Sequence, residues 1–176
     1  MRRFTCEDQV NVVEYSRKGV CSGMSGERKV LINLLAVARY DQAQDFPIQF
    51  MTKGTLSMGN GNAAVLEYTE SQQDEETGEI TTSLITLSME KERVTMTRKG
   101  EYSNTMVFEP EHRFEGTYHT PFGSMDMAVF SRGVRCNIGE TKGPVHLKYQ
   151  LDIQGSYAST NELHLEYKAD GSESIQ

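Results

Sequence analysis

Six polar side chains could form one binding site, because each continues the apolar alternation of a predicted β-strand. Glu70 keeps the phase of Leu66 and Arg98 keeps the phase of Met96, so both charges would face the apolar side of their strands. A charge in that position needs a partner. We therefore expect Arg98 to be shielded and hydrogen-bonded to Glu70, to tyrosine hydroxyls or to backbone carbonyls. The complete set is Tyr68, Glu70, Arg98, Tyr118, Thr120 and Tyr149.

These residue types predict a polar-lined pocket that binds a small amphipathic or anionic molecule inside a β-barrel. Two alternatives stay open on the same residues. In one, Glu70 acts as an acid or base in an enzyme, since the neighbouring Arg98 can tune the pKa of its carboxyl group. In the other, Glu70 and Arg98 lie at strand ends on the rim, the tyrosines belong to an ordinary core, and the filled barrel is a protein-interaction module. We assign no catalytic residue.

Two further patterns suggest chemistry but have simpler interpretations. Residues 59–64 match Gly-x-Gly-x-x-Ala, yet a β-rich run follows where a phosphate-binding loop needs a helix, so Asn60-Gly61 predicts a β-hairpin turn. The histidines lie in a turn or out of phase with the apolar positions and show no ligand spacing. We expect them to share no face and to bind no metal, and we predict no cofactor. The histidines are His112, His119, His146 and His164.

The elements that would position these residues are strands. From Arg28 onward apolar and polar residues alternate with a period of two, short turns separate the runs, and no segment has a helical period. A meander of this length avoids exposed edges by closing on itself. The sequence therefore predicts an all-β fold, a single antiparallel meander β-barrel of about ten strands. The expected runs are 30–38, 46–57, 64–70, 85–89, 94–98, 102–108, 114–120, 125–129, 134–138, 145–153 and 163–167.

One connection can be predicted in more detail. The segment Thr120-Pro121-Phe122-Gly123 should be a tight turn between two antiparallel strands, or a kink within one long strand. Pro121 fixes φ and lacks a backbone donor, while Gly123 tolerates a positive φ.

The length of 176 residues suits one domain with its own core. Residues 1–27 are rich in Ser and Gly and are expected to form a poorly structured N-terminal extension. The barrel should occupy 28–168 and a polar tail 169–176. Deleting the extension is expected to leave the stability of the fold nearly unchanged.

Composition limits the expected partners and location. The formal net charge is −7 and no cluster of Lys and Arg could follow a phosphate backbone, so nucleic acid is not expected as a partner. No apolar run approaches the ~18 residues of a membrane helix, so we expect no membrane association. The three cysteines form no Cys-x-x-Cys pair and the N-terminus lacks a secretory apolar stretch, which together predict a cytoplasmic protein.

A run of short motifs carries a family resemblance. Gly54-Thr55-Leu56 is followed by Tyr68-Thr69-Glu70, and then by the segments 94–100, 118–123 and 147–151. Over residues 28–168 this series resembles the bacterial YwiB-like family, small proteins of unknown function. The resemblance implies a calycin-like, lipocalin-type β-barrel. It implies no reaction and no particular ligand.

Overall fold

The structure is a computed structural model that describes residues 25–74 and 76–171. This part of the chain contains ten β-strands and no α-helix, which confirms the predicted all-β class. It also contains no helix that is long and apolar enough to cross a membrane. The strands are β1 (Ser25–Arg39), β2 (Phe46–Met58), β3 (Ala64–Gln73), β4 (Ile80–Glu90), β5 (Arg93–Lys99), β6 (Asn104–Phe108), β7 (Arg113–Thr120), β8 (Gly123–Cys136), β9 (Lys142–Ile153) and β10 (Ser156–Ala169).

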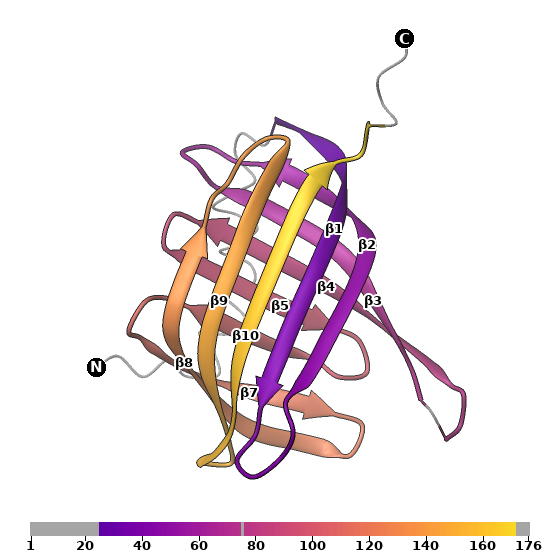
Figure 1. The fold of residues 1–176 in the computed structure, drawn as a ribbon, viewed down its shortest axis with the longest axis vertical. Helices are drawn as coiled ribbons and strands as arrows, with labels where there is room; N and C mark the ends of the chain where they lie inside the picture. Colours follow the sequence, from indigo (N-terminus) through magenta and orange to yellow (C-terminus); the bar gives the residue numbers. More distant parts are fainter. Residues whose placement is uncertain (1–24, 75, 172–176) are drawn as a thin grey trace.

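All of these strands belong to one antiparallel sheet with the order β6-β5-β4-β3-β2-β1-β10-β9-β8-β7. Most ladders join strands that follow one another in the chain. The exception is the long ladder between β1 and β10, which runs from Val30–Ala169 to Arg39–Thr160. Figure 1 shows how the sheet curls around so that β1, β10 and β9 form one wall and β3, β4 and β5 pass behind them. The predicted antiparallel meander barrel is confirmed.

The barrel is nearly closed, and the weakest point of its wall lies between β6 and β7. Ser103 and His119 form a single bridge there, with N···O distances of 3.0 and 2.9 Å. Each ladder between the other neighbouring strands contains at least five residue pairs. Among the described strands, most residues on the facing edges of β6 and β7 therefore pair with no neighbouring strand.

The apolar phase of the strands faces inward and fills one end of the barrel. Ile32 on β1, Leu66 on β3, Leu87 on β4, Val94 on β5 and Leu147 on β9 are completely buried and belong to one core. Full burial of a side chain of this kind contributes about 1.5–3 kcal/mol. This end of the barrel is packed.

The inner face is exposed toward the other end, which we call the open end. β3 pairs with β2 only over Gly54–Met58, so Phe46 and Ile48 at the start of β2 have no β3 residue opposite them. Both share the phase of buried Leu56, yet they are 66% and 45% exposed. In Figure 1 the β3–β4 hairpin extends away from β2 in this region. Apolar side chains that the alternation directs inward are thus accessible from outside.

Two strands are longer than the sequence runs suggested. β8 is continuous where separate runs 125–129 and 134–138 were expected, because a bulge between Ser131 and Gly133 absorbs the irregularity. β10 begins well before the expected run 163–167. Gln154 and Gly155 both have positive φ and connect β9 to β10 in a two-residue turn, so pairing starts at once.

The hairpin between β2 and β3 is present, but its predicted two-residue turn is wrong. The loop is closed by a hydrogen bond of 2.8 Å from the Gly59 N–H to the Ala63 carbonyl. The positive φ values fall on Gly61 and Asn62, one position later than Asn60-Gly61.

The structure places the ends of the barrel slightly outside the predicted range. β1 begins at Ser25 and β10 ends at Ala169. The remainder of the predicted extension, residues 1–24, lies outside the described residues, as do residues 172–176 of the predicted tail.

The connection between β7 and β8 is the tight turn that the sequence predicted. Thr120 pairs with Gly123 at the end of the ladder, so Pro121 and Phe122 form the loop. The Thr120 hydroxyl accepts a hydrogen bond from the Phe122 N–H at 3.2 Å and donates one to the Gly123 carbonyl at 2.8 Å. Gly123 has a φ of 135°, a value that favours glycine.

Replacing Thr120 with Val should lower the free energy of unfolding by about 1 kcal/mol, because both turn hydrogen bonds are lost while the β-branched shape is kept. Urea unfolding followed by circular dichroism measures this loss. Thr117→Val is the matched control, since Thr117 lies in the same strand outside the turn. Equal losses in the two variants would show that the turn hydrogen bonds contribute nothing.

Candidate functional site

An ion pair on the inner face forms the centre of the candidate site. Tyr68 on β3 pairs with Ile85 on β4, and Ile85 pairs with Arg98 on β5, so these three side chains form a row across the sheet. Glu70 lies two residues beyond Tyr68 on the same face. Nη2 of Arg98 donates a hydrogen bond to Oε2 of Glu70 at 2.6 Å. The side chains are only 25% and 15% exposed, so the expected shielded contact between Arg98 and Glu70 is confirmed.

The guanidinium of Arg98 also acts on three predicted tyrosines. Burial raises the pKa of the hydroxyls of Tyr68, Tyr118 and Tyr149, and the positive charge of Arg98 offsets part of this effect in all three. For Tyr68 the negative charge of Glu70 raises the pKa further. The three hydroxyls therefore stay protonated at neutral pH and can donate hydrogen bonds. The positive charge of Arg98 thus lowers the pKa of phenols on three separate strands, β3, β7 and β9.

Aromatic contacts orient two of these phenols. The Tyr149 ring packs against Phe108 with centroids 4.9 Å apart and planes at 59°. Tyr118 stacks on Tyr102 with centroids 6.3 Å apart and planes at 28°. Pairs of this kind contribute about 0.5–1.5 kcal/mol beyond their burial. Tyr149 is partly buried and packs against the core, and burial raises its pKa to about 12.

Thr120 has a different role from the other predicted site residues. Its hydroxyl makes the two hydrogen bonds of the β7–β8 turn. Strand phase predicted that Thr120 would lie on the same face as Tyr118. Because β7 ends at Thr120, its side chain instead forms hydrogen bonds within the turn. The structure thus collects Tyr68, Glu70, Tyr118 and Tyr149 around Arg98 and leaves Thr120 at the turn.

Two residues that the sequence analysis did not select belong beside this group. Asn104 on β6 pairs with Arg98 in the ladder. Its Oδ1 atom is buried and has no hydrogen-bond partner among the described residues, so it is able to accept a hydrogen bond from a ligand. Tyr102 is the stacking partner of Tyr118. Asn104 shares the phase of Met106 on β6, and this was the signal that could have found it.

Gly54 explains how Tyr68 fits into the wall. The two residues are directly opposite in the β2–β3 ladder. A Cβ atom on Gly54 would come within 2.6 Å of the Glu67 carbonyl oxygen and of Cδ1 of Ile32. Such an approach is far too close for any side chain, so only glycine allows β2, β3 and Ile32 to pack this tightly. The glycine of the Gly-Thr-Leu motif has a packing role.

The molecule also has a hollow that is separate from the Arg98 group. Its volume is about 550 Å³, and it lies between β1, β2, β10 and the start of β9. Its lining includes Leu31, Asn33, Met51, Pro144 and Lys168. None of the six predicted site residues lines this hollow. It is therefore a second place where a small molecule could bind, and experiments on the Arg98 group must be controlled against it.

The expectation that no two histidines share a face is wrong for His146 and His164. These residues are directly opposite each other in the β9–β10 ladder. Their rings are stacked with centroids 3.9 Å apart and planes at 22°. Glu162 lies two residues from His164, and the three side chains each bring a possible metal ligand atom within 4.8 Å of the others. No sequence pattern indicated this contact, because only the register between β9 and β10 decides which residues meet.

Comparison with solved structures supports the fold. The chain is similar to the YwiB protein from Bacillus subtilis, with 16% identity and a TM-score of 0.68 over 85% of this chain and 97% of that one. The attachment invasion locus protein Ail of Yersinia pestis also matches, with 9% identity and a TM-score of 0.32 over 82% and 99% of the two chains. That second likeness is too low to support an argument. At 16% identity the first shows a shared fold and nothing about activity.

Comparison by sequence shows the family. No curated protein matches the chain. The family described as a domain of unknown function, DUF1934, matches residues 32–165, which extend from β1 into β10. The predicted family resemblance is confirmed, and the chain belongs to the DUF1934 family.

Proposed function

We propose that this protein binds a small amphipathic molecule at the open end of the barrel. The polar group of the ligand lies against Arg98 and the phenols, and its apolar part lies along the inner face of β2. The observation that supports this most directly is the arrangement around Arg98. One shielded guanidinium influences phenols from β3, β7 and β9 while it pairs with Glu70.

The donors of the site support binding of a polar group. A guanidinium carries five N–H donors, and the contact with Glu70 at 2.6 Å involves one nitrogen, Nη2. The protonated phenols add further donors, and the buried Oδ1 of Asn104 adds an acceptor. Because Glu70 already balances the charge of Arg98, the polar group can be neutral or anionic. An anionic group would share the guanidinium with the carboxylate.

The apolar part of the proposed ligand follows from the divergence of β2 and β3. Phe46 and Ile48 face the inside of the barrel but are 66% and 45% exposed. Covering them would remove apolar surface from water at roughly 25 cal/mol per Å². Phe50 continues the same phase toward the packed core. A molecule with a polar end and an apolar body matches this sequence of environments.

The two alternative functions fit these contacts less well. Catalysis by Glu70 needs a carboxylate that can reach a substrate, but Glu70 is 15% exposed and hydrogen-bonded to Arg98. A filled barrel that serves only as an interaction module agrees with the packed end. It leaves the buried Asn104 Oδ1 and the exposed inward-facing Phe46 without an explanation.

Titration with the amphipathic anion anilinonaphthalene sulfonate tests the proposal, with Nile red as a neutral probe. We expect saturable fluorescence enhancement. Arg98→Met should weaken binding of the anionic probe about tenfold, the loss expected for a hydrogen bond to a charged group. Phe46→Ser should weaken both probes.

Two controls separate this site from other surfaces. Arg135→Met removes the same charge from a position that is paired with His146 on β9 and exposed. Met51→Ser alters the separate hollow. Neither should change probe binding by more than about twofold. Binding that is absent, or that responds to Met51→Ser and not to Arg98→Met, would overturn the proposal.

The Arg98–Glu70 pair should also stabilise the fold. Removal of one partner of a buried ion pair lowers the free energy of unfolding by about 3–5 kcal/mol, and for an exposed pair the loss is about 0–1 kcal/mol. Because the Arg98–Glu70 pair is partly exposed, Arg98→Met should lower the free energy of unfolding by about 1–3 kcal/mol. In a double-mutant cycle with Glu70→Met, the double variant should lose less than the sum of the single losses. The more exposed pair Arg93–Glu109, at 3.3 Å, is the matched control and should show less coupling. Additive losses at Arg98 and Glu70 would contradict a direct interaction.

The raised pKa of Tyr149 predicts how the stability of the fold changes with pH. Its pKa in the folded protein is raised to about 12 from a usual value of 10.0, so the folded state keeps the proton after the unfolded state has lost it. The contribution of the Tyr149 hydroxyl to the free energy of unfolding is therefore complete below pH 10 and is lost as the pH rises toward about 12. The free energy of unfolding in urea should fall over this interval, and Tyr149→Phe should reduce the slope. An unchanged slope in Tyr149→Phe, with Tyr157→Phe as the exposed control, would refute this assignment.

A further inference from the structure

A second group of polar residues lies on the outer face of the barrel. The inward phase of β10 contains Leu163 and Leu165, which are buried in the core. Glu162 and His164 alternate with them and therefore face outward. The β9–β10 register places His146 opposite His164 and Lys148 opposite Glu162. This position is independent of the Arg98 group, which faces the inside.

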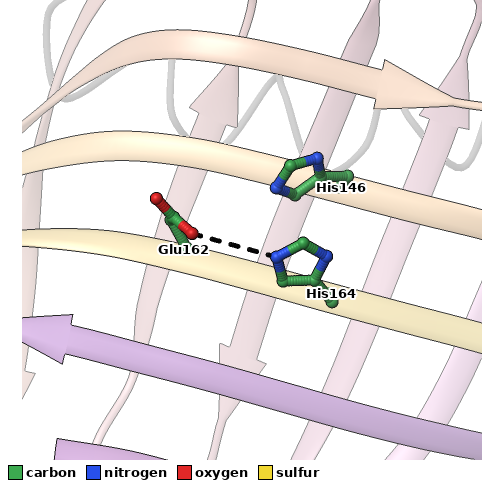
Figure 2. A group of neighbouring side chains, drawn as sticks. All are labelled: His146, Glu162 and His164. Carbon is green, nitrogen blue, oxygen red and sulfur yellow. Dashed lines mark ion pairs between the residues drawn. The ribbon is translucent and has the colours of Figure 1, made fainter.

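The three side chains lie close together. Figure 2 shows His146 and His164 stacked across the two strands, each with one ring nitrogen turned toward Glu162. Nε2 of His164 lies 3.9 Å from Oε2 of Glu162. One ligand atom from each of the three residues lies within 4.8 Å of the other two. Four-coordinate zinc with bonds of about 2.1 Å separates its ligand atoms by roughly 3.4 Å, so rotation of side chains alone can close the site.

The carboxylate is held in a suitable orientation. Oε1 of Glu162 forms ion pairs with two cations, Nη1 of Arg39 at 3.2 Å and Nζ of Lys148 at 3.1 Å. Oε2 is the oxygen on the histidine side. Such outer partners orient the ligands of many metal sites. Their positive charges also oppose a dication, so the expected affinity is moderate.

A separate observation on His146 supports a ligand at this position. Nε2 of His146 is buried and has no hydrogen-bond partner among the described residues. A buried nitrogen without a partner is unfavourable. It lies on the side of the ring that faces Glu162 in Figure 2. A metal ion bound between the three residues would satisfy it.

We propose that His146, His164 and Glu162 form a binding site for a divalent transition metal of the zinc class. Two imidazole nitrogens and one carboxylate oxygen suit Zn²⁺, Ni²⁺ and Cu²⁺, whereas Mg²⁺ and Ca²⁺ prefer oxygen ligands alone. Three protein ligands leave at least one coordination position for water. Because His164 is 47% exposed, the ion can enter directly from solvent.

Isothermal titration of the tag-free full chain with ZnCl₂ tests the site. We expect one equivalent to bind in the wild type, and MgCl₂ and CaCl₂ to give no signal. His146→Gln and His164→Phe should each weaken binding at least about tenfold, because each removes one of three ligands. Glu162→Gln should weaken it to a similar degree. Thermal unfolding without metal checks that each variant is folded.

The matched control is the double variant His112→Gln/His119→Gln. It removes two histidines that lie away from this group, since Nδ1 of His112 contacts the Pro110 carbonyl and Nδ1 of His119 contacts Oγ of Ser124. Zinc binding should be unchanged. With Cu²⁺, electron paramagnetic resonance should show coupling to two nitrogens in the wild type and to one in His164→Phe. The absence of zinc binding, or binding that persists in His146→Gln and His164→Phe, would overturn the proposal.

Discussion

The barrel depends on the pairing of the first strand with the last. The ladder from Val30–Ala169 to Arg39–Thr160 is the one described ladder that joins strands far apart in the chain. Without it the chain would form two separate meanders, β1 to β6 and β7 to β10, each with exposed edges on both sides. Closing so long a loop is entropically costly. The cost is repaid because the inner faces of both meanders then cover one core, with Ile32 on β1 and Leu165 on β10 both completely buried.

Strands β9 and β10 each have two chemically different faces. On β9, Tyr149 faces the inside near Arg98 while His146 faces outward, and on β10 Leu165 and His164 alternate in the same way. A period of two allows one strand to contribute to both sites without conflict. The two proposed sites therefore share strand β9 but use no residue in common.

The polar group around Arg98 is possible only because the barrel is open near it. A fully buried ion pair is rarely favourable, since desolvation of both charges offsets their attraction. At 25% and 15% exposure, Arg98 and Glu70 keep some contact with water while the apolar surroundings limit screening of their 2.6 Å contact. The β2–β3 ladder ends at Gly54, directly opposite Tyr68, so Glu70 and Phe46 both lie beyond the end of this ladder. Phe46 is exposed there.

The sequence by itself determined the strand class and the inward phase, because alternation is a local property. It also named Glu70 among the possible partners of Arg98, because a buried charge demands a partner. Through Pro121 and Gly123 it limited the β7–β8 connection to a tight turn or a kink, and the structure shows the turn. It could not determine that β8 continues through a bulge after Ser131, since the hydrogen bonds that hold a bulge come from the neighbouring strand. Nor could it show that His146 meets His164, or that Asn104 lies beside Arg98. Those contacts depend on the register between strands, and only the closed tertiary structure sets that register.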